Sequence, residues 1–199
     1  MKEDHPYKNT NFYGATKIAG EHMCRSLYHR YRQTNQAFDY VGLRYMNVYG
    51  SRQDYQGAYI AVIMKILDRL DKGLPPIIYG DGSQAYDFIN VVDCARANVC
   101  AMKADVTDKF YNVGRGIRTT IKELAELLLE ITGSTQGIQY EPAGMTFVKN
   151  RIGCPVKARD EIGFEAKIEL RQGLIDLIEW RKNHKSEVEK RRNEAGIKE

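Results

Sequence analysis

Short apolar segments alternate with segments of helical periodicity along this chain of 199 residues, and this alternation limits the fold more than any other feature. Apolar residues recur every three or four positions in the segments predicted as helices, which are 11–34, 59–70, 93–102, 121–131 and 170 to beyond 180. The short apolar segments between them are typical of strands and lie at 38–45, 77–79, 87–92, 110–113 and 138–140. Strands that alternate with helices of this length predict an α/β fold with mainly parallel pairing.

Local signals predict where several elements begin and end. Thr120 and Glu123 have the spacing of a capping box, and Asp93 is placed to cap the helix that follows it. Residues 47–50 (Asn-Val-Tyr-Gly) have the composition of a turn. In helix 11–34 the apolar residues predict one buried face, made of Ala15, Ile18, Ala19, Met23, Leu27 and Tyr31.

Composition argues against several classes of protein. The chain has no run of about eighteen apolar residues and no secretory signal, so we expect a cytoplasmic protein without a membrane span. The net charge is +4, and residues 181–199 hold seven Lys or Arg against four Glu, so we expect residues 183–199 to form a solvated basic helix end or tail rather than a nucleic-acid site. The histidines and cysteines are scattered, so no metal site is expected.

Tyr13 and Lys17 lie four residues apart and therefore share one face of the first helix. A phenol ionises near pH 10, but a neighbouring ammonium stabilises the phenolate. Such a pair can remove a proton from a hydroxyl group at neutral pH. The spacing is equally compatible with an ordinary pair on a helix surface, so other residues must decide between these readings.

Several motifs follow this pair in a fixed order. They are Gly20-Glu21, Leu43-Arg44-Tyr45-Met46-Asn47-Val48-Tyr49-Gly50, Tyr79-Gly80-Asp81-Gly82-Ser83-Gln84, Asp87-Phe88-Ile89 with Asp93, and Tyr111-Asn112-Val113-Gly114. The ordered set resembles the extended short-chain dehydrogenase/reductase family, specifically its NAD-dependent NDP-sugar epimerases and dehydratases. This resemblance implies the C-terminal part of a Rossmann-like doubly wound parallel sheet, joined to a smaller α/β sugar-nucleotide domain. We expect residues 1–55 to belong to the dinucleotide-binding domain and to carry the catalytic helix. We expect residues 56–182 to form mainly the sugar-nucleotide domain, with residues 87–102 returning to the Rossmann sheet.

The same resemblance implies roles for individual residues. Tyr13 would be the catalytic acid/base, and Lys17 would lower its pKa and bind the nicotinamide ribose of NAD. The remaining contacts would be Tyr45 and Val48 to the nicotinamide end, Asn47 to the substrate diphosphate, and Ala58, Tyr59 and Tyr79 to the nucleotide. Residue types alone leave two alternatives open, because Asn47 also suits a turn and Tyr79 also suits a core strand.

One position departs from the family pattern. The family usually has an arginine where this chain has Tyr86, and a phenol offers a diphosphate one hydrogen bond and no charge. Arg151 or Lys149, in a loop that also differs from many relatives, would supply that charge. We therefore expect an altered nucleotide-sugar site that includes Tyr86 and Arg151.

The family's glycine-rich G-x-x-G-x-x-G turn, which holds the dinucleotide pyrophosphate, does not occur in these 199 residues. We therefore expect an N-terminal Rossmann half to be missing and do not expect this chain alone to bind NAD. The expected function is that of a UDP-hexose 4-epimerase acting on an NDP-sugar. The alternatives are an NDP-sugar dehydratase, or a non-catalytic split subunit or inactive fragment. The expected protein partner is a second copy, contacting the outer face of residues 15–31, or a chain that supplies the missing half.

Overall fold

The computed structural model describes residues 1–34, 36, 38–53, 62–143 and 149–194. Its helices are α1 (Phe12–Gln33), α2 (Val62–Asp71), α3 (Val91–Lys103), α4 (Ile121–Thr132), α5 (Val156–Ile162), α6 (Leu170–Asn183) and α7 (Lys185–Glu194). Its strands are β1 (Val41–Tyr45), β2 (Asn47–Tyr49), β3 (Ile77–Tyr79), β4 (Ala85–Tyr86), β5 (Phe88–Asn90), β6 (Lys109–Val113), β7 (Thr119–Thr120), β8 (Gln139–Glu141) and β9 (Asn150–Arg151). The predicted alternation of strands and helices is confirmed.

The strands pair mainly in parallel, as the sequence predicts for an α/β fold. The parallel pairs are β1–β6, β2–β5, β3–β8 and β4–β9, while β4 and β7 are antiparallel. The turn predicted at residues 47–50 is wrong, because Asn47–Tyr49 gains a ladder of hydrogen bonds by pairing with β5.

The start of α3 also differs from the prediction. The strand predicted at 87–92 ends at Asn90, whose side chain accepts a hydrogen bond from the amide of Val92 and caps the helix. Asp93, which was expected to be the cap, is instead a fully buried residue of the first turn. The capping box of Thr120 and Glu123 at α4 is confirmed.

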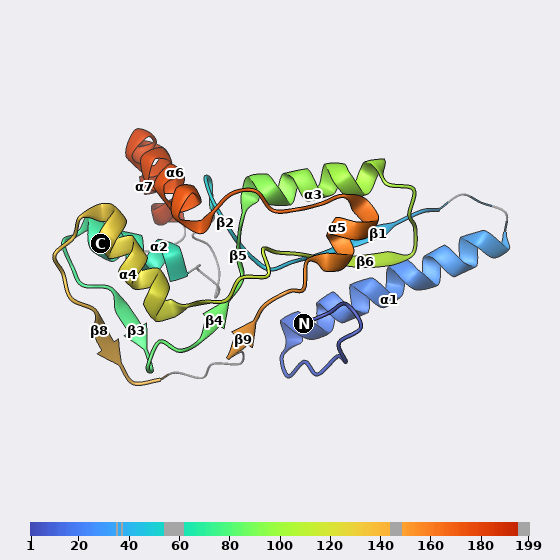
Figure 1. Ribbon diagram of the computed structural model, residues 1–199, viewed down its shortest axis with the longest axis horizontal. Coiled ribbons are helices and arrows are strands. Elements are labelled where there is room, and N and C mark those ends of the chain that lie inside the picture. Colours follow the sequence, from blue (N-terminus) through green and yellow to red (C-terminus); the bar gives the residue numbers. More distant parts are fainter. Residues whose placement is uncertain (35, 37, 54–61, 144–148, 195–199) are drawn as a thin grey trace.

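The first core lies between the β1–β6 pair and helices α3 and α5. Alternate residues of β1, Val41 and Leu43, face this core, as alternate side chains of a strand do. Its buried members are Met46, Ile89, Cys94, Ala97, Tyr111, Val113, Ala158, Ile162 and Phe164. Helix α3 runs along one side of β1 and β6, and α1 runs along the other (Figure 1).

The second core gathers α2, α4 and α6 beside β3. Its largest fully buried side chains include Tyr49, Ile63, Leu67, Leu124 and Leu128. The two cores meet at β5, because Phe88 is buried in the second core and its neighbour Ile89 is buried in the first. A single strand therefore contributes to both cores.

Helix α1 buries a different face from the one the sequence predicts. Ile18 and Tyr31 are partly covered, but Ala15, Ala19, Met23 and Leu27 are exposed, and only Tyr28 is buried. The covered side faces β1, and its Glu21 accepts hydrogen bonds from Arg44 of that strand. The prediction was wrong because apolar spacing marks a face that can be buried, and α1 leaves that face uncovered.

The basic C-terminal end is not simply solvated. Helix α7 buries Val188, and Arg192 forms ion pairs with Asp68 and Asp71 of α2, which also bind the buried Arg181. Part of the excess positive charge is therefore neutralised by neighbouring carboxylates. No helix of the described residues is long and apolar enough to cross a membrane.

Candidate active site

Tyr13 and Lys17 lie in the first two turns of α1. The helix begins there because the Asn11 side chain accepts a hydrogen bond from the Gly14 amide at 2.8 Å. The Lys17 ammonium lies 5.1 Å from the centroid of the Tyr13 ring, and both side chains are exposed. The structure thus brings a cation beside an accessible phenol.

An ion pair fixes α1 against β1. Arg44 donates from Nε to Glu21 Oε1 and from Nη2 to Glu21 Oε2, both at 2.7 Å, and Tyr7 also donates to Glu21. Burial raises the pKa of Glu21, but the hydrogen bonds from Arg44 and Tyr7 outweigh it and hold that pKa below its ordinary value. Arg44 is the penultimate residue of β1, and Tyr13 lies about 12 Å along the helix from Glu21. The Glu21–Arg44 ion pair therefore fixes the position of Tyr13, which lies beyond the carboxyl end of β1.

The residues expected to contact the nicotinamide and the diphosphate lie at this same end of β1. Tyr45 donates its hydroxyl to Asn98 on α3 at 2.9 Å, and the backbone of Asn47 donates to the Asp87 carbonyl at 2.9 Å. Val48 is partly buried beside the first core. Asn47 belongs to a strand, so its alternative role as a turn residue does not hold. Tyr45 binds α3, whereas Tyr13 belongs to α1, which runs along the other side of β1 (Figure 1).

Tyr86 and Arg151 are neighbours. They are paired residues of the parallel strands β4 and β9, and the Asp87 amide donates to the Arg151 carbonyl at 3.0 Å. Paired residues direct their side chains to the same face of a sheet, so the side chains of Tyr86 and Arg151 share one face. Tyr86 also packs edge-on against the ring of Phe88, with centroids 6.2 Å apart.

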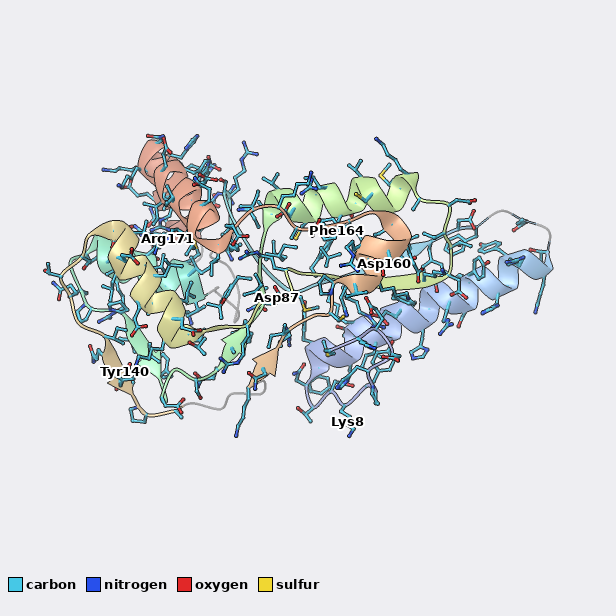
Figure 2. All side chains as sticks on the ribbon, viewed as in Figure 1. Lys8, Asp87, Tyr140, Asp160, Phe164 and Arg171 are labelled. Carbon is cyan, nitrogen blue, oxygen red and sulfur yellow. The ribbon has the colours of Figure 1, made fainter. Side chains whose placement is uncertain are left out.

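Two buried carboxylates organise the site, and their roles were missed from the sequence. Asp87 accepts hydrogen bonds from the amides of Arg115 and Gly116, both at 2.9 Å, and lies near the middle of the molecule (Figure 2). Burial raises the pKa of Asp87, although these amide donors oppose the shift. Asp93 accepts from the amides of Lys167 and Ile168 at 3.0 and 2.9 Å. An acidic residue within an apolar segment was the available signal, because a buried carboxylate requires such donors.

The expected nucleotide contacts are only partly described. Tyr79, in β3, is 57% exposed, so the alternative that it is a core residue does not hold. Ala58 and Tyr59 lie outside the described residues. Arg151 is partly buried and Lys149 is exposed, so both cations of the divergent loop can reach solvent.

The residues present fit one end of NAD. Exposed Tyr13 and Lys17 offer a hydroxyl and an ammonium for a ribose at the carboxyl end of a parallel strand, where α/β folds bind ligands. A pyrophosphate requires free amides at a helix N-terminus directly after a strand. Helix α3 follows β5 directly, but the Asn90 side chain already occupies the amide of Val92. The nicotinamide end therefore fits, while at this helix start the amide of Val92 is already bound by Asn90.

Comparison with known proteins supports this geometry. The chain is 34% identical over 184 residues to a putative UDP-glucose 4-epimerase of Methanocaldococcus jannaschii, covering 92% of this chain and 57% of that protein. It matches the structure of a UDP-glucose 4-epimerase from Thermotoga maritima, solved with UDP-glucose, with a TM-score of 0.85 and 32% identity, again covering 92% and 57%. A UDP-N-acetylglucosamine 4-epimerase from Methanobrevibacter ruminantium, solved with UDP-N-acetylmuramic acid, matches with a TM-score of 0.84 and 30% identity over the same shares.

This chain therefore spans little more than half the length of these relatives. The family model described as the NAD dependent epimerase/dehydratase family matches residues 1–114, which is more than half of the chain. Its Tyr13/Lys17 pair and its parallel α/β fold agree with that match, and the chain belongs to the NAD-dependent epimerase/dehydratase family.

Proposed function

We propose that this chain is the substrate-binding and acid/base portion of an NAD-dependent NDP-sugar 4-epimerase whose substrate is a UDP-hexose. The observation that carries the proposal is the exposed Tyr13/Lys17 pair, held at the carboxyl end of β1 by the Glu21–Arg44 ion pair. The similarity to two 4-epimerases at 30% identity or more supports the same assignment. In this proposal residues 1–55 belong to the dinucleotide-binding domain, and 56–182 form mainly the sugar-nucleotide domain.

The proposed chemistry uses Tyr13 as a base and then as an acid. A bound NAD would supply the hydride acceptor for C4 of the sugar and would give the same hydride back to the opposite face of the keto sugar. Tyr13 takes the proton of the 4-hydroxyl group, and the adjacent Lys17 ammonium stabilises the resulting phenolate. After the sugar has turned over, Tyr13 returns the proton to the oxygen at C4. Tyr45 and Val48, at the end of β1, would contact the nicotinamide ring.

The diphosphate would be held by Asn47 and Arg151. The backbone of Asp87 links these two residues. The Asn47 amide donates to the Asp87 carbonyl, and the Asp87 amide donates to the Arg151 carbonyl. Arg151 would supply the charge that Tyr86 lacks, because its guanidinium stands on the neighbouring strand. Tyr79 has an exposed ring that suits stacking on the base, and Ala58 and Tyr59 complete the proposed nucleotide contacts.

The uncovered face of α1 is the proposed contact with a second copy. Met23 is 66% exposed and Leu27 is 42% exposed on this face, next to Ala15 and Ala19. Exposed apolar residues along one helix are typical of helix–helix interfaces. Sedimentation tests this contact, because a Met23→Glu variant should shift a dimer toward monomer.

Calorimetric titration of the chain with UDP-glucose tests the substrate assignment. We expect Arg151→Ala to weaken binding about tenfold to a hundredfold, as the loss of a charge-assisted contact would. Arg171→Ala is the matched control, because Arg171 is a surface arginine paired only with Glu130 on α4 among the described residues. Absence of UDP-glucose binding to the folded wild-type chain would contradict the proposal. Product analysis with a complete cofactor site then separates an epimerase from a dehydratase or an inactive protein.

A further inference from the structure

Helix α7 is fixed against the second core. Its Val188 is buried in that core, and its Arg192 forms an ion pair with Asp68 of α2. At the junction with α6, the His184 ring stacks on Trp180 with centroids 4.9 Å apart. These contacts hold α7 against both α2 and α6.

One side chain of α7 reaches past this anchor. Arg191 donates from Nη1 to the backbone carbonyl of Arg52 at 2.8 Å and from Nη2 to Glu187 Oε1 at 2.9 Å. Glu187 lies four residues earlier on the same helix, so it orients the planar guanidinium. Arg191 thereby connects the C-terminal helix to the chain that leaves β2, 139 positions earlier.

Arg52 lies in a turn that needs support. Its φ is +63°, in the left-handed region that a non-glycine residue adopts mainly where surrounding contacts hold it. Among the described residues, none of 51–53 takes part in a backbone–backbone hydrogen bond. The side-chain amide of Gln53 donates to the Val48 carbonyl at 3.4 Å, near the limit of a hydrogen bond. The charged donor of Arg191, at 2.8 Å, is therefore the stronger of these two contacts.

This turn lies where the chain passes from one proposed domain to the other. It follows β2, which carries Asn47 and Val48, and in the sequence it leads to Ala58 and Tyr59, the proposed nucleotide contacts. A binding segment whose preceding turn is already ordered loses less conformational freedom when the ligand binds. Order at Arg52 therefore contributes to the affinity for the nucleotide.

We propose that Arg191 is a positioning residue of the nucleotide-sugar site, which holds the Arg52 turn in the conformation that binds the nucleotide. The ligand of the site is taken from the proposed function, so the inference rests on it. Arg191 acts through the backbone of Arg52 and does not take part in proton transfer, which is the proposed task of Tyr13 on α1. With a complete cofactor site, Arg191→Gln should therefore raise KM and leave kcat unchanged.

Trypsin reports the state of the turn without any ligand, because it cleaves the chain after Arg52. Cleavage of a folded protein requires local opening, and its rate follows the population of the open form. In Arg191→Gln we expect the fragment 1–52 to appear at least about tenfold faster than in the wild type, as for the loss of a hydrogen bond to a charged group. Lys190→Gln is the matched control, because Lys190 neighbours Arg191 and is an exposed cation 3.9 Å from Glu194, and it should leave this rate unchanged.

Calorimetric titration then measures the consequence for the site. Arg191→Gln should weaken binding of UDP-glucose at least about fivefold and that of UDP by the same factor, because the proposed contacts after the turn are to the nucleotide. Arg191→Lys keeps a cation that can reach the Arg52 carbonyl or Glu187 but lacks the fork that binds both, so its cleavage rate and affinity should be intermediate. The melting temperatures of all three variants should stay within about 3 °C of the wild type, because the lost contacts lie near the surface.

Unchanged cleavage after Arg52 in Arg191→Gln would overturn the inference, and so would faster cleavage with unchanged affinity for UDP-glucose. A loss of affinity for UDP-glucose alone, with UDP bound as before, would place the effect at the sugar and would contradict the inference as well. A wild-type chain that binds neither ligand would defeat the proposed function and this inference together. Wild-type binding that Arg191→Gln leaves intact would defeat this inference alone.

Discussion

Arg44 of β1 holds Glu21 of α1 through two hydrogen bonds of 2.7 Å, and this pair joins the helix of the proposed acid/base to the strand that ends at the site. Glu21→Gln removes the charge and one acceptor while keeping the shape. We expect the free energy of unfolding to fall by about 1–3 kcal/mol at pH 7, as for other hydrogen bonds to charged groups. Urea denaturation measures this change. Glu126→Gln is the control, because the ion pair of Glu126 within the described residues is a 3.9 Å contact with Lys122 on the surface of α4, and this change should matter little.

The contribution of Glu21 should depend on pH. Its pKa is lowered in the folded state, so its stabilisation is complete above the unfolded-state pKa, near 4.3, and is lost as the pH falls through the folded-state pKa. The difference in unfolding free energy between wild type and Glu21→Gln should therefore be constant from pH 6 to 7 and should shrink below about pH 4. A difference that grew toward low pH would contradict this assignment.

Gly173 of α6 should not tolerate a side chain. A Cβ atom there would lie 2.1 Å from the Tyr49 hydroxyl oxygen and 2.9 Å from Asn90 Nδ2. Gly173→Ala should therefore destabilise the chain by about 1–3 kcal/mol, as other overpacking substitutions do. Gly20→Ala is the matched change in α1, where a Cβ meets no atom of the described residues within 4 Å, and it should stabilise by up to about 1 kcal/mol. Thermal unfolding of both variants measures whether Gly173→Ala lowers the melting temperature and Gly20→Ala raises it.

Tyr13→Phe tests the proposed acid/base without disturbing the fold. Tyr13 is 53% exposed, so the unfolding free energy should change by less than about 0.5 kcal/mol. With a complete cofactor site, turnover should fall about 10²–10⁴-fold, the usual contribution of a general acid/base. Tyr140→Phe removes a hydroxyl from a tyrosine of similar exposure in β8, and it should leave turnover unchanged.

The elements set by local chemistry were predictable from the sequence. Thr120 and Glu123 cap α4 as predicted, because a capping box depends on residues three positions apart. The two-residue strands β4, β7 and β9 were not predicted, because their pairing depends on residues far apart in the chain. The covered face of α1 was predicted wrongly for the same reason, since Glu21 packs there only because Arg44 lies opposite it.

In the site, too, contacts between residues near in sequence were predictable and contacts between distant residues were not. The Tyr13/Lys17 pair follows from helical spacing, whereas the pairing of Tyr86 with Arg151 joins residues 65 positions apart. The hydrogen bonds of Asp87 are the hardest part of the site to predict from the sequence, because their donors, the amides of Arg115 and Gly116, come from a separate loop. Local spacing cannot reveal a contact of that kind.

The placement of Phe88 and Ile89 on opposite faces of β5 has a mechanical consequence. Consecutive residues are anchored in different cores, so the two packed units cannot rotate against each other without pulling one of these side chains from its surroundings. Each is at least 96% buried, and exposing either side chain costs about 2–3 kcal/mol. The molecule should consequently behave as one rigid body when it meets a ligand, and it should lose both cores in a single cooperative transition on heating.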